Sequence, residues 1–259
     1  MKKTYGIDIK WLAVTSFEFR CGNTTVVSDP YITECVGTDC TWENIDNCDI
    51  ILLGHAHWDH VTDIPRLVEK YHPLILCGDQ TALPLAQWLN YTATRIYPMY
   101  PNLELDFGDV KIKALYGRHG PLPGPADERM ERHKNSPANA GDPNLIELGF
   151  WGDFEYRNFL YTTPGGTKIM ICGSKLHRDQ QNILRQEKPD VVLLQVVGVN
   201  GAARTAELMK EIGCKVLIPF HFDFPNSYMN RVEELADALK ELAPEIQYIV
   251  PEYGRWIEL

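Results

Sequence analysis

The first half of the chain alternates short apolar runs with polar turns. Ile50-Ile51-Leu52-Leu53 has the length and the β-branched content of a buried strand. Similar runs predict strands over residues 10–14, 24–27 and 74–77, with a turn at Gly22-Asn23 joining the first two. The helical spacing of apolar positions predicts helices over residues 65–71 and 82–90.

The second half places hairpin patterns before a regular alternation of strands and helices. Gly108-Asp109 separates residues 103–107 from 110–115, and Pro164-Gly165-Gly166 separates 158–162 from 168–172, so each pair predicts a hairpin. Later segments predict helices over 179–186, 205–212 and 231–242, and strands over 191–196, 215–220 and 246–250. Residues 120–155 are rich in proline, glycine and mixed charge, which predicts a long irregular insertion.

Hairpins followed by strand–helix alternation predict two packed sheets with helices outside them, an α/β (α+β) fold. The chain has 259 residues, of which 44% are hydrophobic, so it can build one large core. We therefore expect a single domain over residues 1–259, with the irregular insertion at about 120–155.

The charge balance narrows the classes of partner. The formal net charge is −10, and no Lys/Arg-rich run is present, which disfavours a protein that docks on nucleic acid. Asp8, Lys10 and Glu18 interrupt the stretch after Lys2-Lys3, so we expect no signal peptide, and no apolar run is long enough to span a membrane. Seven scattered cysteines favour a cytoplasmic chain with reduced thiols. The oligomeric state, including a homo-oligomer, is left open.

Four metal-ligating side chains follow the strand that ends at Leu53. They are His55, His57, Asp59 and His60, and imidazole and carboxylate suit zinc and similar divalent ions. A solvated polar turn is the alternative. We favour a metal site, because so dense a group of polar atoms after an apolar strand is costly to bury without a purpose.

Three further residues stand at the ends of predicted strands. His119 follows the strand over 110–115, His221 follows the strand over 215–220, and Asp29 follows the strand over 24–27. Loops at strand ends can converge from distant parts of a sequence. We therefore expect these side chains near the first cluster, although each can also be a core or turn residue.

The motif His55-x-His57-x-Asp59-His60, with Asp29 before it and single histidines after it, resembles the metallo-β-lactamase superfamily. Residues 15–30 resemble the branch that contains ascorbate-6-phosphate lactonase and N-acylphosphatidylethanolamine phospholipase D. The resemblance implies a four-layer αββα sandwich with a dinuclear site. His55, His57 and His119 would hold the first metal, and Asp59, His60 and His221 the second. Asp29 would orient the loop that carries the ligands.

One position departs from the superfamily pattern. Most members carry a metal-bridging Asp after the strand of the second hairpin, where this chain has Ser174. A hydroxyl is a weaker ligand than a carboxylate, so the second metal is expected to bind more weakly, or one metal to suffice. Asp142 in the insertion could supply a replacement carboxylate.

The resemblance implies a metal-dependent hydrolase, with one or two divalent ions, zinc first and manganese or iron as alternatives. A metal-bound hydroxide would attack the substrate, and Asp59 would orient it as the catalytic residue. The expected substrate is a small, anionic ester, lactone or phosphoester. The candidate substrate contacts are Arg118, Lys175, His177, Trp58 and Tyr31, each of which can equally be an ordinary loop residue. An iron-dependent oxidoreductase on the same fold and a catalytically degenerate binding protein are the alternatives.

Overall fold

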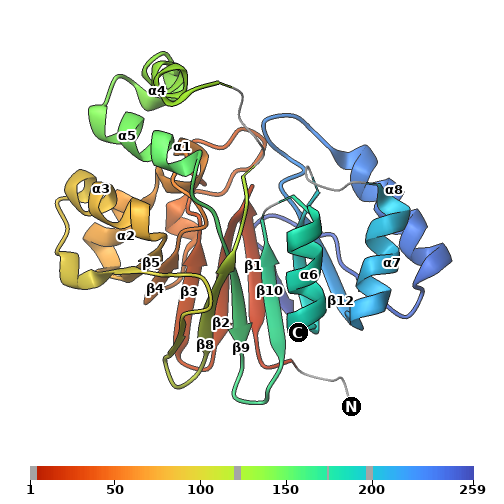
Figure 1. Ribbon diagram of the computed structural model, residues 1–259. Coiled ribbons are helices and arrows are strands. Elements are labelled where there is room, and N and C mark those ends of the chain that lie inside the picture. Colours follow the sequence, from red (N-terminus) through yellow and green to blue (C-terminus); the bar gives the residue numbers. More distant parts are fainter. Residues whose placement is uncertain (1–4, 120–123, 174, 197–200) are drawn as a thin grey trace.

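The described residues form two sheets of seven strands each (Figure 1). The structure is a computed structural model that describes residues 5–119, 124–173, 175–196 and 201–259. The first sheet has the order β14 (Trp256–Glu258), β1 (Asp8–Ala13), β2 (Ser16–Cys21), β3 (Thr24–Ser28), β4 (Ile50–Leu52), β5 (Leu74–Cys77) and β6 (Ile96–Pro98). The second has the order β13 (Gln247–Tyr248), β12 (Val216–Phe220), β11 (Val191–Gln195), β10 (Lys168–Cys172), β9 (Arg157–Thr162), β8 (Lys111–Tyr116) and β7 (Glu104–Asp106).

The two sheets pack face to face through aromatic and β-branched side chains. The rings of Phe19 in β2 and Tyr161 in β9 lie 4.9 Å apart, and those of Phe17 in β2 and Phe220 in β12 lie 5.5 Å apart. All four side chains are buried. Since period-2 alternation sends successive side chains to opposite faces, each sheet also has an outer apolar face that must be covered.

Helices cover both outer faces. α2 (Ile64–Tyr71) and α3 (Asp79–Leu89) pack on the first sheet around Leu67 and Leu85. α6 (Arg178–Glu187), α7 (Ala202–Ile212) and α8 (Met229–Leu242) pack on the second. Figure 1 shows the resulting order of helix, sheet, sheet and helix, so the predicted αββα sandwich is confirmed. Short helical segments are α1 (Trp58–Val61), η1 (Trp42–Asn44) and η2 (Ala93–Arg95).

The segment expected to be an irregular insertion is largely helical, so that expectation was wrong. It contains α4 (Ala126–Lys134), η3 (Pro137–Asn139) and α5 (Pro143–Gly152). Pro125, Pro137 and Pro143 stand at helix starts, where the missing N–H has no intrahelical acceptor to lose. Figure 1 shows α4 and α5 at the end of the sandwich that also carries α1.

The N-terminal region was predicted with one strand too few. β2 lies between the two expected strands, and Gly22-Asn23 joins β2 to β3. Glu18 broke the apolar pattern, yet it is fully buried because Lys10 lies 2.6 Å from its carboxylate. Both charges of this pair are satisfied inside the sheet face.

The carboxyl ends of several parallel strands gather at one edge of the sandwich. β3, β4 and β5 are parallel, as are β10, β11 and β12. Three non-glycine residues just after strands adopt left-handed backbone conformations at this edge: Val14 (φ 44°), Asp29 (φ 39°) and His221 (φ 57°). His221 N donates to Val14 O at 3.2 Å. Strained conformations of this kind persist where surrounding contacts fix them, as they often do at functional sites.

Candidate metal centre

Three imidazoles from two loops form the first group of ligand atoms. His55 and His57 follow β4, and His119 follows β8, and one ring nitrogen of each lies within 4.8 Å of the others. Nε2 of His55 lies 3.1 Å from Nδ1 of His57. The His119 ring lies 4.7 Å from the His57 ring and 5.1 Å from the His55 ring, centroid to centroid.

A second group adjoins the first. Asp59 and His60 in α1 and His221 after β12 also place one ligand atom each within 4.8 Å of one another. The centroids of the His55 and His60 rings are 3.9 Å apart, so the two groups are in direct contact. The structure therefore brings together all six residues that the sequence singled out as metal ligands.

Asp29 contacts both the loop that carries the first ligands and one ligand of the second group. Its Oδ1 accepts a hydrogen bond of 2.7 Å from Gly54 N and lies 3.4 Å from Nδ1 of His60. Thr15 Oγ1 lies 3.1 Å from the same nitrogen. Since His60 Nδ1 faces Asp29 and Thr15, its Nε2 is left to face the second group.

The crowding of the imidazoles perturbs their protonation. Burial lowers the pKa of His55 well below its ordinary value, and the neighbouring histidines lower it further. Burial also lowers the pKa of His221, against the opposing effect of Asp59. For His60, burial lowers the pKa, but Asp29 and Asp59 together outweigh it and raise the pKa. Neutral imidazoles at His55 and His221 offer lone pairs, which is the state that binds metal.

The separation between two ligand atoms of the first group fits a tetrahedral ion. Zinc binds imidazole nitrogen at about 2.0–2.1 Å, so two ligands at tetrahedral angles lie about 3.3 Å apart. The 3.1 Å between His55 Nε2 and His57 Nδ1 is close to that separation. The donor set of five imidazoles and one carboxylate also suits zinc, manganese or iron.

Two residues in the helical segment reach the site and were not singled out from the sequence. Asp153, directly after α5, places Oδ1 2.9 Å from Nε2 of His57. His133 in α4 places Nε2 3.2 Å from Oδ2 of Asp153. The His133 side chain is only 15% exposed, because it contacts Asp153 and packs closely on Gly149 of α5. Asp142 does not act as a replacement ligand in this structure: its side chain accepts from Asn144 N and caps α5.

The candidate substrate residues fall into two sets. Tyr31 and Trp58 belong to an aromatic wall with Phe224, with centroid separations of 5.3–5.7 Å, and Tyr31 donates its hydroxyl to Glu34 O. Arg118 and Lys175 are exposed, the former directly before His119, and His177 is half-buried at the start of α6. Ser174 lies outside the described residues, so its predicted role remains a prediction.

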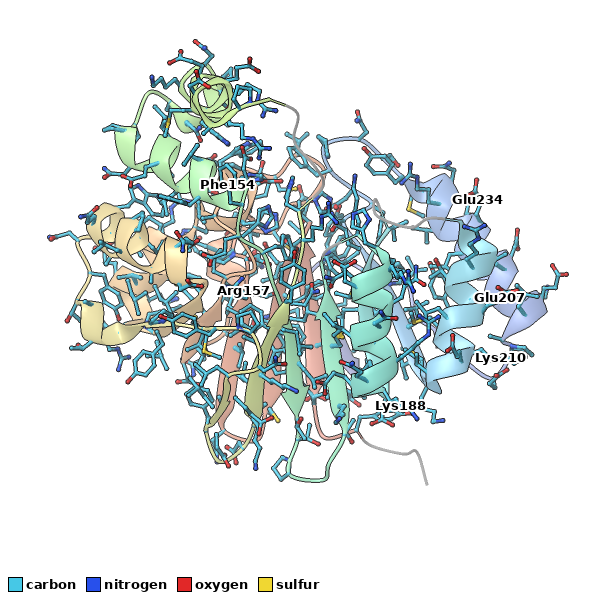
Figure 2. All side chains as sticks on the ribbon, in the orientation of Figure 1. Phe154, Arg157, Lys188, Glu207, Lys210 and Glu234 are labelled. Carbon is cyan, nitrogen blue, oxygen red and sulfur yellow. The ribbon has the colours of Figure 1, made fainter. Side chains whose placement is uncertain are left out.

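A small pocket adjoins His57. Its volume is about 240 Å³, and it is lined by His57, Trp58, Arg132, His133, Ser136 and Asp153. Figure 2 labels Phe154 and Arg157, which mark where the chain leaves this pocket and passes from α5 into β9. Arg157 binds Glu155 at 2.9 Å and Asp79 at 2.6 Å, so it fixes this connection against α3.

Comparison with known proteins agrees with this fold. The family model described as a β-lactamase superfamily domain matches residues 8–221. The chain therefore belongs to the metallo-β-lactamase superfamily. It is 28% identical over 209 residues to a UPF0173 metal-dependent hydrolase from Geobacillus sp. strain WCH70, covering 78% of this chain and 79% of the relative.

Solved structures show the same fold at low identity. Igni18, a metallo hydrolase from Ignicoccus hospitalis, matches with a TM-score of 0.70 at 16% identity, over 97% of each chain. CmlA, a diiron β-hydroxylase from Streptomyces venezuelae, matches with a TM-score of 0.63 at 12% identity, over 98% of this chain and 54% of that one. Within the described residues, no helix is both long enough and apolar enough to cross a membrane.

Proposed function

We propose that this protein is a metal-dependent hydrolase of small, anionic esters, lactones or phosphoesters. The main support for the proposal is that two groups of three ligand residues meet at one edge of the sandwich. In each group, one ligand atom of every residue lies within 4.8 Å of the others. Membership of the superfamily and the similarity to metal-dependent hydrolases support it. We place zinc first as the ion; manganese and iron suit the same ligands.

The six candidate ligands form two metal positions. His55, His57 and His119 would hold the first ion, and Asp59, His60 and His221 would hold the second. A divalent ion bound there would act as a Lewis acid and bring the pKa of a water molecule toward neutrality. Burial raises the pKa of Asp59, but the neighbouring imidazoles outweigh it and keep the pKa below its ordinary value. Asp59 is therefore a carboxylate at neutral pH, which can orient the attacking water and accept its proton.

The pocket beside His57 supports a small substrate. Its volume of about 240 Å³ is below the usual range for drug-sized ligands, which begins at roughly 300 Å³. Arg132 and Ser136 line it and offer donors to a carboxylate or phosphate, and Trp58 offers an apolar wall. Arg118, directly before His119, and Lys175 are exposed, and we assign them as further sources of positive charge for the substrate. The resemblance of residues 15–30 to the lactonase branch favours a phosphorylated lactone among these classes.

The test combines metal analysis with substrate panels. Purified protein is expected to contain one or two equivalents of metal, and to hydrolyse a member of a panel of lactones, phosphodiesters and β-lactams until chelator is added. His119→Asn is expected to abolish turnover. His72→Asn is the matched control, because His72 is exposed in a left-handed conformation that asparagine tolerates.

The two rival functions give different results. An iron-dependent oxidoreductase would retain iron with a visible absorption spectrum and consume an oxidant instead of water. A degenerate binding protein would carry a tight ligand through purification and turn over nothing. Metal-loaded protein with no hydrolysis of any panel member would count against the proposal.

A further inference from the structure

The imidazole of His57, in the first group, contacts a buried carboxylate through the nitrogen that faces away from His55. The Asp153 side chain is 2% exposed and lies 2.9 Å from Nε2 of His57 through Oδ1. Its other oxygen, Oδ2, lies 3.2 Å from Nε2 of His133. Both oxygens of the buried Asp153 carboxylate therefore face imidazole nitrogens.

Two glycines of α5 make this network possible. A Cβ at Gly152 would lie 2.7 Å from Cδ2 of His57 and 3.0 Å from its backbone nitrogen. A Cβ at Gly149 would lie 2.6 Å from Nδ1 of His133. Both separations are shorter than real Cβ contacts, so α5 can pack this closely on both imidazoles only because these positions lack a side chain.

The two nitrogens of His57 face different partners. Nδ1 faces His55 and the first ligand group, whereas Nε2 faces Asp153. A carboxylate accepts hydrogen bonds, so we place the proton of this contact on Nε2 of His57, and Nδ1 then keeps its lone pair for a metal. A carboxylate behind a metal-binding histidine fixes both the tautomer and the ring orientation.

We propose that Asp153 and His133 are positioning residues for His57, and that the helical segment of residues 124–153 thereby helps to build the first metal position. This inference rests on the metal centre of the proposed function. His133 acts one step further out, because it fixes the oxygen of Asp153 that His57 does not use.

The same three residues suggest a competing arrangement. His57, His133 and Asp153 also place ligand atoms within 4.8 Å of one another, so they form a group that could itself hold a metal. The separations of 2.9 and 3.2 Å from Asp153 to the two imidazoles match hydrogen bonds, which favours the positioning role. A third equivalent of metal would be the mark of the competing arrangement.

The test measures metal affinity directly, without substrate. Zinc is titrated into metal-free protein in competition with a chromophoric chelator, for the wild type, Asp153→Asn and Asp153→Ala. We expect Asp153→Ala to lose about 10–100-fold in affinity at one position only, and Asp153→Asn, which keeps an oxygen acceptor, to lose less. Glu147→Gln is the matched control, because it removes an exposed carboxylate from the same helix.

Nitrogen NMR of the histidines gives a readout that a merely structural role would not move. Metal-free wild-type protein is expected to hold His57 with its proton on Nε2, and Asp153→Ala to lose this preference. If Asp153→Ala does not fold, His133→Gln serves instead, with an affinity loss in the same direction and smaller.

Wild-type zinc affinity in the folded Asp153 or His133 variants would overturn the inference. It would also be overturned if the wild type bound three equivalents of zinc and Asp153→Ala bound only two. Hydrolysis in the wild type would still be intact in those cases. If the wild type instead binds metal as described but hydrolyses nothing, the proposed function fails and the positioning role stands.

Discussion

Adding one methyl group at Gly152 is expected to weaken the first metal position without unfolding the protein. Alanine Cβ at this site would lie 2.7 Å from Cδ2 of His57, where ordinary contact begins at 3.4 Å. Helix α5 or the imidazole must therefore move by about 0.7 Å. If that movement falls on the contact between His57 Nε2 and Asp153 Oδ1, the distance grows from 2.9 Å to about 3.6 Å, beyond hydrogen-bonding range.

The cost in stability is expected to leave the protein folded. Overpacking costs about 1–3 kcal/mol, and the greater helix propensity of alanine returns up to about 1 kcal/mol. A net loss of about 0–3 kcal/mol lowers the Tm of a chain of this size by at most about 12 °C. Zinc affinity, in contrast, is expected to fall by about 10–100-fold.

The assay compares zinc affinity and thermal unfolding in Gly152→Ala and Gly165→Ala. Gly165 lies in the turn between β9 and β10, where a Cβ would be 3.8 Å from Thr163 Oγ1, so alanine fits. The control is expected to match the wild type in affinity. A Gly152→Ala protein with wild-type zinc affinity would refute the reasoning that close packing of α5 sets the geometry of His57.

Three other substitutions separate the parts of the structure. His221→Gln should cost the second metal equivalent and leave the first, as measured by elemental analysis; loss of both or neither would contradict the assignment of two groups. Asp29→Ala should leave buried Gly54 N without its acceptor, at about 1–3 kcal/mol in denaturant unfolding, and an unchanged midpoint would count against this. Lys10→Met should strand the fully buried Glu18 carboxylate and cost about 3–5 kcal/mol, and adding Glu18→Leu should restore most of it.

Most of the strands and the ligand motif could be predicted from the sequence, because both depend on residues that lie close together in the chain. The run ending at Leu53 and the cluster from His55 to His60 could be interpreted within a dozen residues. His119 and His221 were predicted from their positions at strand ends, and the structure places both beside that cluster. The parallel register of β10, β11 and β12 explains why residues so distant in sequence meet at one edge.

The network around Asp153 had no comparable signal. Asp153 and His57 are 96 positions apart, and a single carboxylate at a helix end is an ordinary feature. The prolines of residues 120–155 were interpreted as loop signals, whereas those at 125 and 143 stand at helix starts. Gly149 and Gly152 are visible in the sequence, but the reason for them is the close packing of α5 on His133 and His57, which can be seen only once α4 and α5 are in place.

Anomalous diffraction from zinc-loaded crystals tests the central claim most directly. We predict one peak at bonding distance, about 2.0–2.2 Å, from Nδ1 of His57 and the facing nitrogens of His55 and His119. A second, weaker peak is predicted among Asp59, His60 and His221. Zinc bound elsewhere, with both ligand groups empty at saturating metal, would contradict the account.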